Sequence, residues 1–557
     1  MKIIKRLLLL LILSVLSFTL ISCGDKKQQD TSTEEGAEFV YKINESGEAS
    51  IIRYKGKSAQ IIIPEQIDGY PVTGIGESAF FNNTKITEVT LPSGIVLIGK
   101  SAFEGCSTLR KINLPSTVEK IGDKGFYNCI CLEELAIESG SALKEIGDNA
   151  LSGCRSLKGE EYGNAKYLST GDSPYDILLS AKDTSITTAE IHTDTRIING
   201  GAFDRCASLT SITIPENIEF IGNSAFYGCT KLETIFFNAV SMGDLTPSAN
   251  LFARVATTSE TMTLYVGSSV KRIPANLMNG TSRLRVLRFI DGSVCESIGE
   301  GAFANTPLPE VTIPASVKVI EPLAFANCDW LKTIKLDSIQ LNDLDDNNRI
   351  FEGSCDKVTD VTLTIGRNVV HVPSYFCESM HRLNYVKFEN NEVTKSFGEG
   401  AFFGCQTILK VDITSRKAWC ESSFANEYSN PLRYGNAVLY VNNKSVTEGF
   451  ALTENIDYIA DYAFTGYKKL EKIIIPKTVT YIGKNAFDGV ENLNHIYWCG
   501  NEAEWRALSI QNGNYIINSS IIYYYRAFEL GNPTTAGNYW YLNDEGTPNV
   551  WRNVITN

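Results

Sequence analysis

The apolar residues of this chain recur with a fixed spacing of 23 positions, as the step from Phe80 to Phe103 shows. One copy of the pattern consists of an alternating segment, Leu209–Pro215, and the segment Ile221–Cys229. A period in the twenties predicts a solenoid, in which each coil packs only on its neighbours. The repeated phenylalanine occupies Phe80, Phe103, Phe126, Phe203, Phe226, Phe464 and Phe487, and at altered spacing Phe303, Phe325, Phe402 and Phe424.

Each copy predicts a short strand, because apolar residues lie two positions apart in it. Ile112 and Leu114 are expected to face the core, while Lys111 and Asn113 face outward. The proline that follows many of these strands has no amide donor, so it ends the pairing. The glycine of the repeated Ile-Gly step suits a tight turn, and the Ala-Phe step places the other side of the coil in the core.

The outward strand positions form two columns along the predicted array. The C-terminal half of these columns is richer in lysine and aromatic residues, which are types that anchor interfaces or glycans. The alternative is a solvated sheet that binds nothing. The candidate binding face consists of Phe236, Lys335, Tyr385, Lys387, Lys410, Lys472, His495 and Tyr497.

The array is predicted to span residues 73–500, with departures from the period inside it. Polar insertions lie near 155–183 and 426–446, and the copies are degenerate over 237–289 and 340–390. Binding specificity is expected to depend on the parts that differ from copy to copy, namely the outward strand positions, the insertions and the aromatic C-terminal end.

Both ends of the array are predicted to be capped. Residues 38–72 contain period-two strands that would shield the open N-terminal edge. Residues 501–557 contain a short helix over Glu502–Leu508 and an aromatic hairpin across Asp544-Glu545-Gly546. Trp540 and Trp551 are interpreted first as part of this cap, with an aromatic binding platform as the alternative.

The N-terminus predicts export. Residues 1–22 combine a basic start, an apolar run and small residues before Cys23, as a secretory signal does. The ending Leu-Ile-Ser-Cys resembles a bacterial lipobox, in which Cys23 becomes the acylated first residue. Residues 23–37 are almost devoid of apolar side chains and are expected to form a flexible tether. The chain would then lie on a membrane through its lipid anchor, rather than cross it.

Composition excludes several functions. The 557 residues carry a formal charge of −13, which argues against nucleic acid because phosphate binding needs basic patches. The four histidines are far apart in sequence and form no ligand cluster. The segment Gly398–Gly404 is a repeat copy rather than a phosphate loop. Asp343–Asn347 lacks the glycine and glutamate of a calcium loop, although a loose cation site is an alternative there. No residues are proposed for catalysis, for a metal or for a cofactor.

The fourteen cysteines do not predict a disulfide framework. Seven of them follow the repeat phenylalanine position by three residues, so they should stack as a buried column of thiols. An occasional bond between adjacent copies is the alternative. The seven are Cys106, Cys129, Cys154, Cys206, Cys229, Cys328 and Cys405.

Taken together, these motifs resemble the BspA-like, or treponemal-type, leucine-rich repeat. The resemblance covers roughly residues 60–500 and is carried by Ile214-Pro215, Ile221-Gly222, Ala225-Phe226 and Cys229. It implies a mainly β repeat solenoid with short strands on one face. Family members are commonly exported bacterial proteins, often lipoproteins, and several are adhesins.

The resemblance therefore implies a lipoprotein at the outer-membrane surface. Its strand face would bind a host extracellular-matrix protein or a partner on another bacterium. The alternative is a glycan-binding accessory lipoprotein that uses the C-terminal aromatic hairpin.

Overall fold

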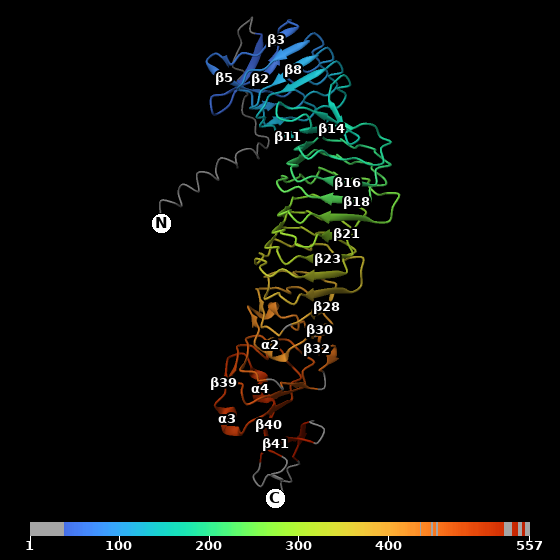
Figure 1. Ribbon diagram of the computed structural model, residues 1–557. Helices are drawn as coiled ribbons and strands as arrows, with labels where there is room; N and C mark the ends of the chain where they lie inside the picture. Colours follow the sequence, from blue (N-terminus) through green and yellow to red (C-terminus); the bar gives the residue numbers. More distant parts are fainter. Residues whose placement is uncertain are drawn as a thin grey trace.

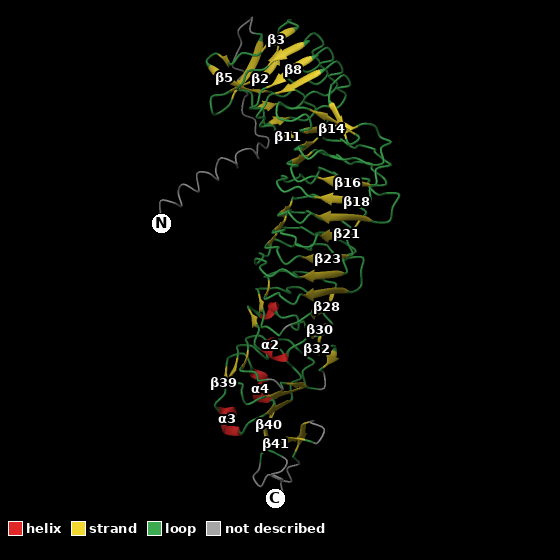
Figure 2. Cartoon of the chain, in the orientation of Figure 1, coloured by secondary structure: helices red, strands yellow, loops and turns green. Residues whose placement is uncertain are grey.

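The computed structural model shows an elongated solenoid with its coils stacked along one axis (Figure 1). It describes residues 38–551 except 391, 435, 447–448, 453–454, 528–536 and 544–547. The leader, Cys23 and the tether lie outside these residues. The predicted mainly β solenoid is confirmed, and strands and turns dominate it (Figure 2).

The main strands lie side by side in parallel ladders along one face of the solenoid. Their pairing is in register, so that Ser211, for example, lies opposite Thr234. The ladders break into four groups. These are β3 (Gln60–Ile62), β6 (Glu88–Thr90), β8 (Lys111–Leu114) and β10 (Glu134–Ile137); β16 (Ser211–Ile214), β18 (Thr234–Phe237), β19 (Met262–Val266) and β21 (Leu284–Phe289); β23 (Glu310–Ile313), β25 (Thr333–Leu336), β26 (Val361–Ile365), β28 (Leu383–Phe388), β30 (Lys410–Ile413), β32 (Val438–Val441) and β33 (Lys444–Ser445); and β34 (Phe450–Ala451), β36 (Lys472–Ile475), β38 (His495–Trp498), β40 (Ile521–Tyr525), β41 (Tyr539–Leu542) and β42 (Pro548–Val550).

A second set of strands runs along another side of the coils, mostly two residues long at the Ile-Gly step. Each pairs in parallel with a strand of a neighbouring coil, as Lys120–Ile121 does with Leu97–Ile98. The set contains β5 (Tyr70–Ile75), β7 (Leu97–Ile98), β9 (Lys120–Ile121), β11 (Glu145–Ile146), β15 (Ile197–Ile198), β17 (Phe220–Ile221), β20 (Arg272–Ile273), β22 (Ser297–Ile298), β24 (Val319–Ile320), β27 (His371–Val372), β29 (Ser396–Phe397), β31 (Ser423–Phe424), β35 (Tyr458–Ile459), β37 (Tyr481–Ile482) and β39 (Ser509–Ile510).

The repeat phenylalanines stack on one another inside the coils. The rings of Phe80 and Phe103 lie 4.8 Å apart with planes 7° apart, and the rings of Phe203 and Phe226 lie 5.3 Å apart. Phe252 continues the stack from Phe226 at 5.2 Å. The segments whose sequence pattern is degenerate are therefore complete coils with longer loops, since Phe351 stacks on Phe325 in the same way.

The glycine of the Ile-Gly step is needed for close approach between coils, which corrects the expectation of a turn conformation. A Cβ on Gly222 would lie 2.4 Å from the Gly200 nitrogen, and one on Gly122 would lie 2.7 Å from the Lys100 nitrogen. Neither glycine has a positive φ. The left-handed conformation occurs instead just before the Ala-Phe step, at Ser101 (φ 52°) and Ser224 (φ 57°).

The repeat cysteines form the buried column of thiols that their spacing predicts. The Sγ atoms of Cys106, Cys129 and Cys229 each lie 3.1 Å from the carbonyl oxygen of the preceding coil's phenylalanine. Cys206 and Cys405 have other acceptors, the Asp183 oxygen at 3.9 Å and the Cys377 oxygen at 2.9 Å. Cys154 keeps the contact, at 3.2 Å from the Phe126 oxygen, but it is half-buried.

The N-terminal segment forms the strands that its alternation predicts, β1 (Phe39–Ile43) and β2 (Ala49–Tyr54). They pair antiparallel, and β2 then pairs in parallel with β5 of the second strand set. The short strand β4 (Gln66–Ile67) also joins β5 as a hairpin. This antiparallel pair lies at one end of the stacked coils (Figure 1).

The insertion at 155–183 forms strands of its own and packs into the solenoid. β12 (Glu160–Tyr162), β13 (Ala165–Leu168) and β14 (Ile177–Ala181) pair antiparallel, and β14 then pairs in parallel with β15. The hydrophobic core divides into two clusters at this insertion.

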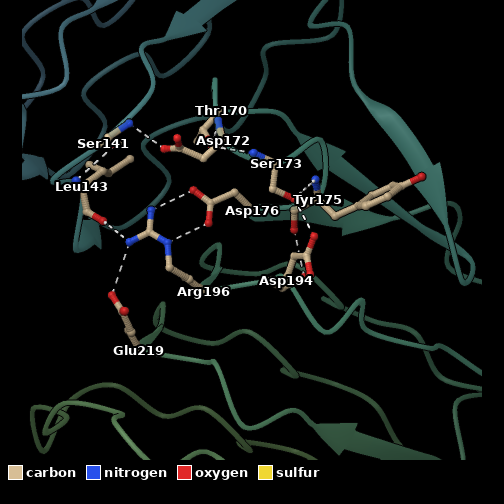
Figure 3. Close-up of polar contacts among 12 residues, drawn as sticks. Ser141, Leu143, Thr170, Asp172, Ser173, Tyr175, Asp176, Asp194, Arg196 and Glu219 are labelled. Carbon is tan, nitrogen blue, oxygen red and sulfur yellow. Dashed lines mark hydrogen bonds and ion pairs between the residues drawn. The ribbon is translucent and has the colours of Figure 1, made fainter.

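Arg196 joins the insertion to the coils on either side of it (Figure 3). Its Nε and Nη2 atoms each donate to Asp176, at 2.8 Å, and Asp176 is only 3% exposed. Its Nη1 atom donates to the Leu143 carbonyl oxygen and to Glu219, both at 3.4 Å. A guanidinium shared in this way satisfies a buried carboxylate, so we interpret the cluster as structural.

The second insertion contributes a complete strand, because β32 pairs in register with β30. The chain forms α2 (Arg416–Cys420) before the insertion and the short helix η1 (Glu427–Ser429) at its start, neither of which the sequence pattern predicts. Ser415 caps α2, and the buried Trp419 donates from Nε1 to the Ala463 carbonyl oxygen at 3.0 Å.

The C-terminal region contains the predicted helix α3 (Glu502–Arg506), followed by the unpredicted α4 (Tyr515–Ser519) and β40. β41 and β42 form the two strands of the predicted hairpin, with Trp540 opposite Val550. The predicted turn, Asp544-Glu545-Gly546, lies outside the described residues. In the part of the chain that the structure describes, no helix is long and apolar enough to cross a membrane.

Candidate binding surface

The outward residues of the main strands form one long surface, which we call the outer strand face. It consists of the two columns that begin at the first and third residues of a typical main strand, such as Thr333 and Lys335 of β25. The observed register confirms both columns. Tyr385 lies opposite Lys410, and Lys472 lies opposite His495.

In the N-terminal part of this face, the polar side chains form ion pairs and hydrogen bonds within the array. Lys111 forms an ion pair with Glu134 at 2.9 Å. Asn113 accepts from the Leu91 nitrogen at 2.8 Å and donates to the Leu91 oxygen, which extends the pairing of neighbouring coils. Such contacts favour a solvated sheet in this part of the array.

Phe236 begins the aromatic part of the outer strand face. It is 36% exposed, and its ring stacks on Tyr265 of the next strand with centroids 5.0 Å apart. The sequence does not single out Tyr265, because its coil carries the longer loop. The pair presents a flat apolar surface on β18 and β19.

Lys335 and Lys387 lie in the same column but have different surroundings. Lys335 forms ion pairs with Asp337 at 3.2 Å and with Glu389 at 3.0 Å. Lys387 is exposed, and among the described residues no carboxylate pairs with it. Of these two predicted binding lysines, Lys387 is therefore the one whose charge faces solvent.

Lys410 is held between two tyrosine rings. Its Nζ atom lies 4.6 Å from the centre of the Tyr385 ring and 4.3 Å from the centre of the Tyr440 ring. It also forms an ion pair at 3.3 Å with Asp412, whose side chain is 5% exposed and accepts from the Tyr385 hydroxyl at 2.9 Å. Lys410 thus completes a cluster that joins three strands, rather than extending toward solvent.

At the C-terminal end of the face, the aromatic residues continue as a stack. Lys472 is exposed on β36, and His495 and Tyr497 are half-buried on β38. Tyr497 stacks on Tyr523 of β40 with centroids 5.2 Å apart. The register therefore extends the predicted face by one more strand.

The structure places Trp540 inside the C-terminal cap. Its side chain is 1% exposed, and its Nε1 atom donates to the Trp498 carbonyl oxygen at 2.9 Å. Because the ring is covered, Trp540 does not offer an open aromatic platform. Trp551 is half-buried, and its ring lies 4.5 Å from that of Tyr541.

One constellation with catalytic residue types was not anticipated, because its members are 28 and 25 positions apart. His371 lies 2.9 Å from Asp343 through Nε2 and 2.7 Å from the Ser396 hydroxyl through Nδ1. In chymotrypsin-type serine proteases the N–H of the serine itself helps to bind the oxyanion. Here that N–H donates to the Val370 carbonyl oxygen at 2.9 Å as part of coil pairing.

The Asp343 carboxylate has further partners in the fold. It accepts from the Ser374 nitrogen at 2.7 Å and from its hydroxyl at 2.8 Å. Partial burial raises the pKa of Asp343, but the hydrogen bonds from Ser374 and His371 outweigh it and hold the pKa below its ordinary value. We interpret this cluster as a tie between coils. Among the described residues, no group of three or more His, Cys, Asp or Glu side chains is arranged to hold a metal ion.

Comparison with known proteins identifies the repeat. A sequence profile described as the BspA type leucine rich repeat region matches six copies, over residues 57–167, 181–292, 296–430 and 439–518. The chain belongs to the BspA-type leucine-rich repeat family. No curated protein matches it.

Several solved structures are similar to this BspA-type chain. A leucine-rich repeat protein from Bacteroides ovatus is 20% identical, with 88% of this chain and 98% of that chain covered and a TM-score of 0.32. A leucine rich cell surface protein from Faecalibacterium prausnitzii is also 20% identical, with coverages of 87% and 98% and a TM-score of 0.22. The pneumococcal vaccine antigen PcpA is 19% identical, with coverages of 73% and 96% and a TM-score of 0.30.

Within this BspA-type array, the eight predicted face residues fall into two groups. Phe236, Lys387 and Lys472 are exposed. The other five are half-buried in contacts with neighbouring coils, and they are Lys335, Tyr385, Lys410, His495 and Tyr497. The exposed group is the one that a partner could contact without rearrangement of the coil.

Proposed function

We propose that this chain is a surface lipoprotein whose outer strand face binds a macromolecular partner and so mediates adhesion. The partner would be a host extracellular-matrix protein or a component of another bacterium's surface. The family, the lipobox-like leader and the length of the face support this proposal. Elongated solenoids generally present such a surface to their partners.

The observation that carries the proposal is the alignment of aromatic and cationic side chains in register along the C-terminal half of the face. From β25 to β40 the two columns contain lysine, tyrosine or histidine on most strands, and β26, with Thr362 and Thr364, is an exception. Aromatic residues supply large contact area in protein interfaces, and exposed cations steer association. The stacked rings are also fixed in place by their neighbours, which reduces the entropy lost on binding.

A binding screen tests the proposal. The full chain with Cys23→Ser, which removes the lipid anchor, would be applied to immobilised matrix proteins and to intact cells of other bacteria. We expect saturable binding to at least one of them. Absence of binding to every matrix protein and every cell type would contradict the adhesive function.

Location at the cell surface needs its own test. Protease treatment of intact cells should cleave the wild-type chain if its array faces outward, as adhesion requires. A periplasmic control protein should survive the same treatment. Full protection of the chain on intact cells, with cleavage only after lysis, would exclude a surface location.

A further inference from the structure

The C-terminal end of the array contains a cavity of about 530 Å³ that the outer strand face does not include. One wall is formed by α3 and the other by the ends of β40 and β41. This volume lies in the range of small-ligand sites, roughly 300–1,000 Å³. The lining side chains used in this argument are Tyr524, Tyr525, Tyr539, Glu502, Ala503 and Arg506.

The aromatic wall of this cavity is exposed but supported from behind. Tyr525 is 40% exposed, and its ring meets the buried ring of Trp540 edge-on, with centroids 5.2 Å apart. The hydrogen bond from Trp540 to the Trp498 oxygen fixes that support. A Cβ on Gly537 would lie 2.9 Å from the Tyr539 ring, so the glycine leaves room for that ring beside the backbone.

The opposite wall is polar and is carried by a helix that packs against the array. Glu502 and Arg506 form an ion pair at 2.5 Å across one turn of α3, and their side chains are 55% and 77% exposed. Asn501 and Glu504 form a capping box at the start of the helix. Trp505 is 8% exposed and packs against Trp498 with centroids 5.5 Å apart, which holds α3 against the array.

These two walls favour a neutral ligand that has both an apolar face and several hydroxyl groups. A tyrosine ring offers a flat surface to the C–H face of a sugar, while Glu502 can accept and Arg506 can donate hydrogen bonds to hydroxyls. The arginine is paired with a carboxylate and the whole chain carries −13, so an anionic ligand is disfavoured. We propose that this cavity is a carbohydrate-binding site for a neutral oligosaccharide.

Calorimetric titration of the full chain carrying Cys23→Ser tests this inference. The probes are four neutral oligosaccharides, namely cellobiose, N,N′-diacetylchitobiose, lactose and maltotriose. We expect at least one to bind. Tyr525→Ala should then weaken its affinity by about tenfold or more, which corresponds to about 1.4 kcal/mol. Glu502→Gln should weaken it too, and because that side chain is exposed, the variant keeps the fold intact.

Tyr515→Ala is the matched control, since Tyr515 is 77% exposed on α4 and does not line the cavity. Tyr515→Ala should leave saccharide binding unchanged. Lys387→Ala, on the outer strand face, should also leave saccharide binding unchanged. Failure of the adhesion proposal can therefore be distinguished from failure of the carbohydrate-site proposal. The inference is overturned if none of the four saccharides binds. It is also overturned if Tyr525→Ala and Glu502→Gln both bind like the wild type, or if the cavity takes up only peptides.

Discussion

At the scale of single residues, Lys410 shows that an outward-facing cation can serve the fold. Its ammonium lies between Tyr385 and Tyr440 and beside the buried carboxylate of Asp412. Replacing it with methionine keeps the apolar stem but leaves Asp412 without this ion pair. We expect Lys410→Met to lower the free energy of unfolding by about 2 kcal/mol, as measured by chemical denaturation.

Lys472→Met is the matched control for that substitution. Lys472 is exposed in the same column, and in the described part of the chain it forms no ion pair. Its replacement should change stability by less than about 0.5 kcal/mol. Equal effects of the two substitutions would show that Lys410 is not part of a structural cluster.

The buried thiols make a second prediction at this scale. Burial raises the pKa of Cys229 to about 12, and that of Cys106 also to about 12. Since the thiolate is the reactive form, both should resist iodoacetamide at pH 8 in the folded chain. Half-buried Cys131 should be alkylated before either of them. Mass spectrometry of the labelled peptides checks this order, and prompt modification of Cys229 without unfolding would contradict it.

Residue types and spacing were enough to predict the phenylalanine stack and the thiol column, because both follow from the period. The reason for the glycine in the Ile-Gly step was not predictable in this way. It depends on how closely neighbouring coils approach, which a linear pattern does not contain. The burial of Trp540 likewise depends on where Trp498 and Tyr497 lie, which the linear pattern does not contain.

At the scale of elements, the close approach of adjacent coils can be tested at Gly222. An added methyl group would lie 2.4 Å from the Gly200 nitrogen, so the coils would have to separate. We expect Gly222→Ala to destabilise the array by about 1–3 kcal/mol, measured by thermal unfolding. Gly243→Ala should cost nothing, because the nearest atom to its Cβ is the Glu219 oxygen at 3.9 Å and its φ is not positive. Equal losses in both variants would contradict the steric explanation.

The hydrogen bonds of Asp343 connect its loop to His371 of β27 and to Ser374, and they should make stability depend on pH. Because the folded-state pKa is lowered, the ionised carboxylate stabilises the fold above its unfolded value of about 3.9. That contribution is lost as pH falls further and the carboxylate is protonated. Asp343→Asn should therefore be less stable than the wild type at pH 7, and the difference should shrink below about pH 4. A difference that stays constant from pH 7 to pH 3 would refute the linkage.

Elements with a strong period, such as β8, β16 and β36, were predictable from alternation alone. The helices α2 and α4 were not, and α2 depends on tertiary contacts of Trp419 that the repeat pattern does not contain. The coils at 237–289 and 340–390 were blurred by longer loops, although their strands keep register with their neighbours.

At the scale of the whole molecule, stacking produces an elongated body with the four ladders of main strands along one side (Figure 2). Its hydrophobic core divides at the insertion near 155–183, where Arg196 joins the flanking coils. The N-terminal part of the outer strand face is satisfied by internal polar contacts, whereas the C-terminal half presents stacked rings and exposed lysines. We therefore propose the C-terminal half of this face as the adhesive surface.

The most direct test compares binding by three versions of the full chain with Cys23→Ser, using a partner found in the screen. One is otherwise unchanged, one carries Lys387→Ala with Lys472→Ala, and one carries Lys484→Ala. Lys484 is exposed close in sequence to Lys472 but follows the Ile-Gly step, on another side of the coil. We expect the double variant to bind the partner at least about tenfold more weakly than the unchanged chain. Lys484→Ala should bind the partner as the unchanged chain does. The double variant and Lys484→Ala should both have the melting temperature of the unchanged chain. Undiminished binding by the double variant, or an equal loss in Lys484→Ala, would contradict the assignment of binding to the outer strand face.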